Sequence, residues 1–89
     1  MIIETKELVI SEELKRKVNM ICKFTSVNYE LINGSVISLK NTNIAYVKPH
    51  ILKVNGNYYL IFDECDDIFI NSYEKKIKFK DLEKYLKLN

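Results

Sequence analysis

Four carboxylates and a thiol lie within the six residues at 62–67, where the sequence reads FDECDD. Such groups can bind a metal ion, and closely spaced acids can also attract a basic partner. A calcium loop, however, alternates its acids and needs a glycine at its sharp turn, and neither feature is present here. We therefore interpret the segment first as a turn after a strand, second as an acidic docking surface and third as a metal site. Its acids are Asp63, Glu64, Asp66 and Asp67.

Covalent catalysis would need Cys22 or Cys65 next to His50, the one histidine of the chain. Cys22 falls on a predicted apolar helix stripe, and Cys65 is flanked by acids, which is a poor setting for a nucleophilic thiolate. Both glycines belong to Asn-Gly pairs, so no glycine-rich loop can close around a nucleotide phosphate. The sequence therefore predicts no enzyme, no cofactor and no metal, with a metal-dependent nuclease as a minor alternative.

A helix is predicted over residues 12–24. Ser11 can cap its first backbone N–H groups, and the two glutamates that follow suit the positive end of the helix dipole. Apolar residues then recur at helical spacing, at Leu14, Val18, Ile21 and Cys22. A second helix is expected near the C-terminal end, where Asp81 can cap a turn with an inner face of Leu82, Tyr85 and Leu86.

Two Asn-Gly pairs, Asn33-Gly34 and Asn55-Gly56, each lie between runs rich in β-branched and aromatic residues. Asn-Gly favours the positive φ values of a two-residue type I′ turn, so both pairs predict tight hairpins. Further strands are expected at 2–10, 43–48, 67–71 and 76–79. The result is a small single α+β domain over residues 1–89, with a curved antiparallel sheet of five to seven strands and a helix near each end.

The predicted hairpin at 50–62 is apolar on both faces. One face carries Leu52, Val54, Tyr59 and Ile61, and the other carries Ile51, Tyr58, Leu60 and Phe62. An antiparallel hairpin with one solvated face normally alternates apolar and polar side chains. Either the rest of the domain encloses this hairpin, or one face contacts a partner or a second copy. Because Tyr58 and Tyr59 point to opposite faces, we expect at most one of them in the core.

Lysines form a possible basic edge near the C-terminal end. Lys76 and Lys78 share one face of a predicted strand, and Lys80 and Lys84 continue the edge toward the last helix. Lysine can bind phosphate, but Arg16 is the one arginine, so bidentate recognition of guanine has little support. The formal net charge of +2 is also mild. A solvated face is the main interpretation, and a nucleic-acid contact is the alternative.

These exclusions favour a small non-enzymatic protein that binds and inhibits or modulates another protein, or that pairs with itself as a homodimer. The expected contact residues are the two tyrosines and the four acids: Tyr58, Tyr59, Asp63, Glu64, Asp66 and Asp67. The partner is expected to be a protein, for example one that handles nucleic acid. The alternative function is a small transcriptional regulator that binds nucleic acid with its lysine edge.

Composition adds an expectation about origin and location. Lysine, isoleucine and asparagine are abundant and have AT-rich codons, which indicates an AT-rich genome, bacterial or phage. Together with the exclusions and the small domain, this favours an inhibitor of host machinery, such as a defence system, of the kind that phages or mobile elements encode. The first residues are charged and lack an apolar signal region, and no apolar run approaches the length of a membrane span. We expect a cytoplasmic protein without a membrane partner.

Overall fold

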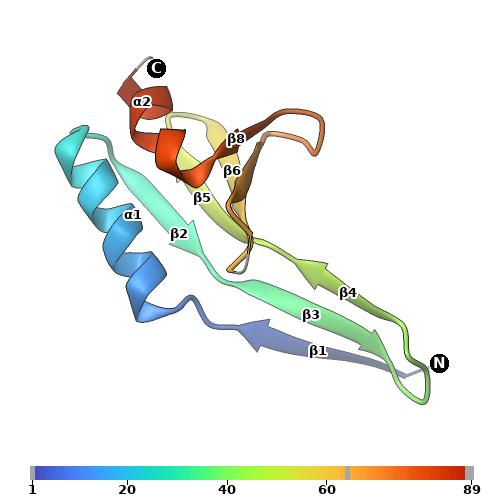
Figure 1. Ribbon diagram of the computed structural model, residues 1–89. Helices are drawn as coiled ribbons and strands as arrows, with labels where there is room; N and C mark the ends of the chain where they lie inside the picture. The colour runs from blue at the N-terminus through green and yellow to red at the C-terminus, as the bar shows by residue number, and fades with distance from the viewer. Residues whose placement is uncertain (1, 64, 88–89) are drawn as a thin grey trace.

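The computed structural model describes residues 2–63 and 65–87, and this part of the chain forms eight strands and two α-helices (Figure 1). Every strand pair is antiparallel, and the predicted α+β class is confirmed. In chain order the elements are β1 (Ile3–Leu8), α1 (Glu12–Phe24), β2 (Tyr29–Ile32), β3 (Gly34–Leu39), β4 (Ala45–Lys48), β5 (His50–Val54), β6 (Asn57–Ile61), β7 (Asp67–Ile70), β8 (Lys76–Lys78), a 3₁₀ turn (Phe79–Asp81) and α2 (Leu82–Lys87).

The strands form two sheets and not one. A five-stranded sheet has the order β2-β5-β6-β7-β8, and a three-stranded sheet has the order β1-β3-β4. We call the five-stranded sheet with its helices the body and the three-stranded sheet the arm. The arm extends away from the body, and the molecule measures 46 × 27 × 21 Å (Figure 1).

Two long strands connect the arm to the body. β2 leads directly into β3, and β4 leads directly into β5, so the same pair of chain segments belongs to both sheets. The antiparallel register is kept throughout, from Tyr29 opposite Val54 in the body to Ser38 opposite Ala45 in the arm. We call the region around residues 33–34 and 49–50, where these strands pass from one sheet to the other, the joint.

The core lies between the body sheet and the two helices, which cover the same face of that sheet (Figure 1). α1 has the predicted bounds, and the Leu14 N–H donates to the Ser11 hydroxyl oxygen at 3.2 Å, as the predicted cap requires. Helix and strand residues are buried together in one cluster: Val18, Cys22, Leu52, Val54, Tyr59, Ile61, Ile68, Ile70, Leu82 and Leu86. Burial of apolar side chains on one face thus anchors both helices to the body.

The second Asn-Gly hairpin is confirmed. Val54 pairs with Asn57 across the turn, and Asn55 and Gly56 have φ values of 51° and 81°, as a type I′ turn demands. These values suit the two residue types, because glycine has no Cβ and asparagine tolerates the left-handed region.

The prediction of a hairpin at the first Asn-Gly pair is wrong. Asn33-Gly34 does not reverse the chain but joins β2 to β3, and the reversal falls at residues 40–44, where Asn41 has a φ of 65°. Gly34 is needed for another reason, which is close packing. A Cβ at this position would collide with the carbonyl oxygen of Lys48 on the opposite strand. The glycine therefore permits the close approach of two backbones at the joint.

Candidate protein-binding surface

The side of the body sheet opposite the helices, which we call the outer face, carries a continuous apolar row. Residues paired across an antiparallel sheet share a face, so one row is formed by Ile32, Ile51, Leu60 and Phe69. All four side chains are half-buried, although neither α-helix lies on this face (Figure 1). The outer face is thus an apolar surface that water still reaches.

Aromatic rings extend this row. The Phe69 ring lies 6.3 Å from that of Phe62, nearly perpendicular to it, and 5.3 Å from that of Tyr73. Tyr58 lies on the same face beneath the Lys53 ammonium, which is 5.3 Å from its ring centre. Tyr58 and Tyr73 remain 46% and 61% exposed, so both rings offer a large apolar area with a polar tip.

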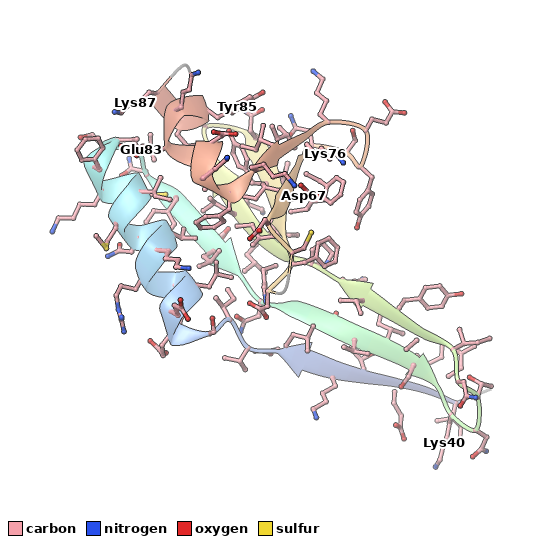
Figure 2. All side chains as sticks on the ribbon, in the orientation of Figure 1. Lys40, Asp67, Lys76, Glu83, Tyr85 and Lys87 are labelled. Carbon is pink, nitrogen blue, oxygen red and sulfur yellow. The ribbon has the colours of Figure 1, made fainter. Side chains whose placement is uncertain are left out.

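The two tyrosines of the hairpin separate as the alternation predicts. Tyr58 points outward, whereas Tyr59 is fully buried and meets the Tyr85 ring edge-on at 6.2 Å. Tyr85 lies on α2 in Figure 2, so Tyr59 packs on the helix side of the sheet. The assignment of Tyr59 to the partner surface is therefore wrong, because its ring is part of the core. Tyr58 keeps its assignment.

The acidic segment is a turn, and two of its acids are bound within the chain. The Cys65 N–H donates to the Phe62 carbonyl at 3.3 Å, which closes the turn after β6. Asp63 Oδ2 lies 2.8 Å from the His50 ring, and Asp67 Oδ1 lies 2.7 Å from the Lys78 ammonium. The predicted turn is thus present, and these two acids bind side chains of other strands.

Of the remaining two acids, only Asp66 can be described. Its side chain is exposed beside the turn, and its backbone carbonyl accepts the Phe79 N–H at 2.7 Å. Glu64 lies outside the described residues. Asp66 is therefore the acid most available to a partner in the described part of the segment.

The contact between Asp67 and Lys78 connects β7 to β8. The hydrogen bond from the Lys78 ammonium holds the pKa of the Asp67 carboxyl below its ordinary value, and the same contact raises the pKa of Lys78. Because the pKa of the carboxyl is lowered by folding, the contact stabilises the fold above the unfolded-state pKa. That contribution is lost as the pH falls through the lowered value.

His50 is the one strongly buried polar side chain among the described residues, with 2% of its surface exposed. The Gly34 N–H donates to its Nδ1 at 2.8 Å, so this nitrogen carries no proton. The proton of the neutral ring is then on Nε2, which donates to Asp63 at 2.8 Å. The predicted hairpin begins at residue 50, and His50 is the first residue of β5. Its role as a connection between the two long strands at the joint was not predicted.

Neither candidate thiol is among the hydrogen-bond partners of His50 in the described part of the chain. Both nitrogens of His50 are hydrogen-bonded within the chain. Cys22 is in the core, where burial raises the pKa of its thiol to about 11, so the thiol stays protonated at neutral pH. Cys65 is exposed, and its sulfur accepts the Asp67 N–H at 3.4 Å. This arrangement matches the small buried thiol expected for Cys22.

The predicted lysine edge divides between two surfaces. Lys76 and Lys78 are exposed on the outer face, opposite Phe69 and Asp67. Lys80 and Lys84 follow on the 3₁₀ turn and on α2, so the chain has left the sheet before it reaches them. Figure 2 shows Lys76 near Asp67 on the body, whereas Lys40 lies at the far tip of the arm.

A pocket of about 480 Å³ lies at the joint and has a mainly apolar lining of Leu8, Val47, Lys48, Pro49, His50, Ile61, Phe62 and Asp63. Within residues 2–63 and 65–87, no three His, Cys, Asp or Glu side chains are placed so that they could hold a metal ion together. Over the same residues, neither helix has the length and apolar character needed to cross a bilayer.

Comparison with protein-family models, with curated proteins and with solved structures finds no match to this chain. The assignment of a function therefore depends on the surfaces just described.

Proposed function

We propose that this chain is a non-enzymatic protein that binds another protein through the outer face. The observation that carries the proposal is the apolar row of the outer face, which neither helix covers. A sheet face that meets only water usually carries polar side chains, whereas an apolar face suits contact with another surface.

The arrangement of residue types on the outer face resembles that of a protein interface. Tyr58 and Tyr73 are exposed rings with few rotatable bonds, and such residues are enriched where partners bind tightly. Ion pairs border the apolar row on both sides, between Lys53 and Glu30 at 3.8 Å and between Lys78 and Asp67. An apolar centre with a charged rim would exclude water at the centre and fix the orientation of the partner at the rim.

The more specific form of this proposal is an inhibitor or modulator of host machinery encoded by a phage or mobile element. It is supported by the AT-rich character of the residue composition and by the small size of the chain. The host target would present an apolar patch that matches the row. Asp66, which is exposed in the turn before β7, would favour a partner that also carries a basic group.

The test is a comparison of Tyr58→Ala with Tyr46→Ala, because Tyr46 is also exposed but lies on the arm. Each purified variant is used to capture proteins from a host lysate, and the Kd of the captured protein is then measured by calorimetry. Tyr58→Ala should cost roughly 2 kcal/mol of binding, about a 30-fold rise in Kd, because a central aromatic contact is lost. Tyr46→Ala should leave the Kd unchanged. Equal affinity of both variants for the same protein would contradict the proposal.

A second candidate function, binding of single-stranded nucleic acid, is favoured by one feature of the same face. Lys76 lies directly opposite Phe69, whose half-buried ring is 5.3 Å from the exposed ring of Tyr73, and Lys78 follows on the same strand face. Proteins that bind single strands combine aromatic rings, on which bases stack, with lysines that contact the phosphates. The sequence alone suggested phosphate contacts, and the Phe69 ring opposite Lys76 is the additional support for this candidate.

For this candidate, the expected result is binding of a fluorescent oligothymidine at physiological salt that Lys76→Glu weakens. Loss of one phosphate contact should also reduce the slope of log K against log salt by about 0.7. Lys40→Glu is the matched control, since it makes the same change of charge at the tip of the arm (Figure 2). Absence of binding, or equal weakening by both variants, would reject specific nucleic-acid binding by the outer face.

A further inference from the structure

We propose that two copies of this chain associate through the free edge of β1, in antiparallel orientation, about a two-fold axis at Thr5. β1 lies at the edge of the arm, with β3 as its one neighbour in the sheet. Its residues from Ile3 to Glu7 are all exposed. An exposed edge strand presents backbone groups to which another strand can hydrogen-bond. This inference is independent of the outer face.

The hydrogen bonds of the arm show which residues of β1 face outward. The Lys40 N–H donates to the Ile2 carbonyl at 2.9 Å, so Ile2 is bonded toward β3. In an antiparallel strand, successive residues direct their N–H and C=O groups to opposite sides. Glu4 and Lys6 therefore also bond toward β3, whereas Ile3, Thr5 and Glu7 direct their backbone groups to the free edge.

The charges of β1 select one register for pairing with itself. With the axis at Thr5, Glu4 of each copy lies opposite Lys6 of the other, which gives two ion pairs. Moving the register two residues in either direction places Glu4 opposite Glu4 or Lys6 opposite Lys6. Opposite charges stabilise a cross-strand pair, and like charges destabilise it. Within the described residues neither Glu4 nor Lys6 belongs to another ion pair, so both are available.

The apolar residues of β1 fit the same register. Ile2 and Ile3 are 61% and 59% exposed in the single chain. In the pair, Ile2 would lie next to Leu8 of the second copy, and Ile3 would cover the methylene groups of Glu7. The two arms would then form one continuous six-stranded sheet in the order β4-β3-β1-β1-β3-β4. Because each copy uses the same strand, the contact is complete in the dimer and leaves no free β1 edge for a third copy.

The other edge of the arm, β4, is less suited to pairing. The Leu39 N–H donates to the Ile44 carbonyl at 3.2 Å, which places Ala45 and Val47 toward the free side of β4, and Pro49 is next in the same alternation just after the strand ends. Proline has no N–H, so it interrupts the row of donors that a partner strand would need. β1 contains no proline.

The first test is sedimentation equilibrium at low salt with charge-reversed variants. Glu4→Lys gives a chain with lysine at both facing positions, and Lys6→Glu gives one with glutamate at both. Each variant alone should dimerise roughly tenfold or more weakly than the wild type, because two attractive pairs become repulsive. An equimolar mixture of the two variants should recover wild-type affinity as a heterodimer, since every facing pair is again of opposite charge. A wild type that stays monomeric at millimolar concentration, or a mixture that does not associate, would overturn the proposal.

The second test distinguishes the two edges of the arm. Thr5→Pro removes a donor that faces the free edge of β1, so it should abolish the dimer while circular dichroism shows an intact fold. Val47→Pro makes the matching change on β4 and should leave the dimer intact. The reverse pattern would overturn the assignment to β1. Tyr58→Ala should not change the dimer Kd, which separates this contact from the proposed outer-face interface.

Discussion

Replacing Tyr59 by alanine is expected to lower the free energy of unfolding by about 3–5 kcal/mol, the range for truncation of a large buried aromatic side chain. The ring is fully buried between the sheet and α2, where it meets Tyr85 edge-on. Its removal would leave a cavity that the surrounding strands cannot fill, because β6 pairs on both sides with β5 and β7. Urea unfolding followed by circular dichroism measures the change directly.

Tyr58→Ala is the matched control, because it removes the same ring from the neighbouring position on the opposite face. This ring is 46% exposed and contacts the Lys53 ammonium, so its loss should cost about 1 kcal/mol or less. Equal destabilisation by the two variants would show that the two faces of β6 are not assigned correctly. A larger loss for Tyr58→Ala would mean that β6 is shifted by one residue, since such a shift exchanges the two faces of a strand.

The sequence predicts well those elements that local chemistry determines. α1 begins after Ser11 and ends at Phe24 as expected, because its cap and its apolar stripe both lie within the helix. The hairpin at Asn55-Gly56 also forms as expected, with adjacent strands and a turn of the predicted type. Both elements need only contacts between residues close in sequence, so a single sequence contains their signals.

Asn33-Gly34 shows where local chemistry is not enough. This dipeptide has the same turn preference as Asn55-Gly56, yet the chain continues straight through it from β2 to β3. Distant residues occupy its polar groups, since Asn33 accepts the Ile10 N–H and donates to Glu7, while the Gly34 N–H donates to His50. These partners lie up to 26 residues away, and no local rule identifies them.

The candidate surface was partly predictable, because some of its features follow from the alternation of side chains along single strands. Alternation along β5 and β6 identified two apolar faces, and it separated Tyr58 from Tyr59. It could not determine which face the helices cover, because that depends on how α1 and α2 pack. The turn itself was predicted, but the partners of Asp63 and Asp67 were not, because the side chains that bind them come from the starts or ends of other strands.

His50→Ala is expected to lower the free energy of unfolding by about 2–4 kcal/mol, since it creates a cavity and leaves a buried donor without a partner. The Gly34 N–H donates to the His50 ring, at a point where β2 becomes β3 and the backbone of Lys48 lies very close. Loss of the ring should therefore loosen the joint more than the core of the body. Amide hydrogen exchange should show the greatest loss of protection at Gly34 and in the neighbouring strands of the arm.

Two control variants separate the buried side of this contact from the exposed side. His50→Asn keeps an oxygen that can accept the Gly34 N–H, so it should recover part of the lost stability and part of the protection at Gly34. Asp63→Ala removes only the partner of Nε2. Asp63 is 39% exposed, so water can replace its carboxylate, and we expect a loss of about 1 kcal/mol or less. If Asp63→Ala were as damaging as His50→Ala, the stabilisation would reside in the hydrogen bond between Nε2 and Asp63. If the Gly34 amide stayed protected in His50→Ala, the ring would not be what connects the two long strands. We expect His50→Ala to cost more stability than Asp63→Ala, because water can reach the Asp63 side of the ring but not the Gly34 side.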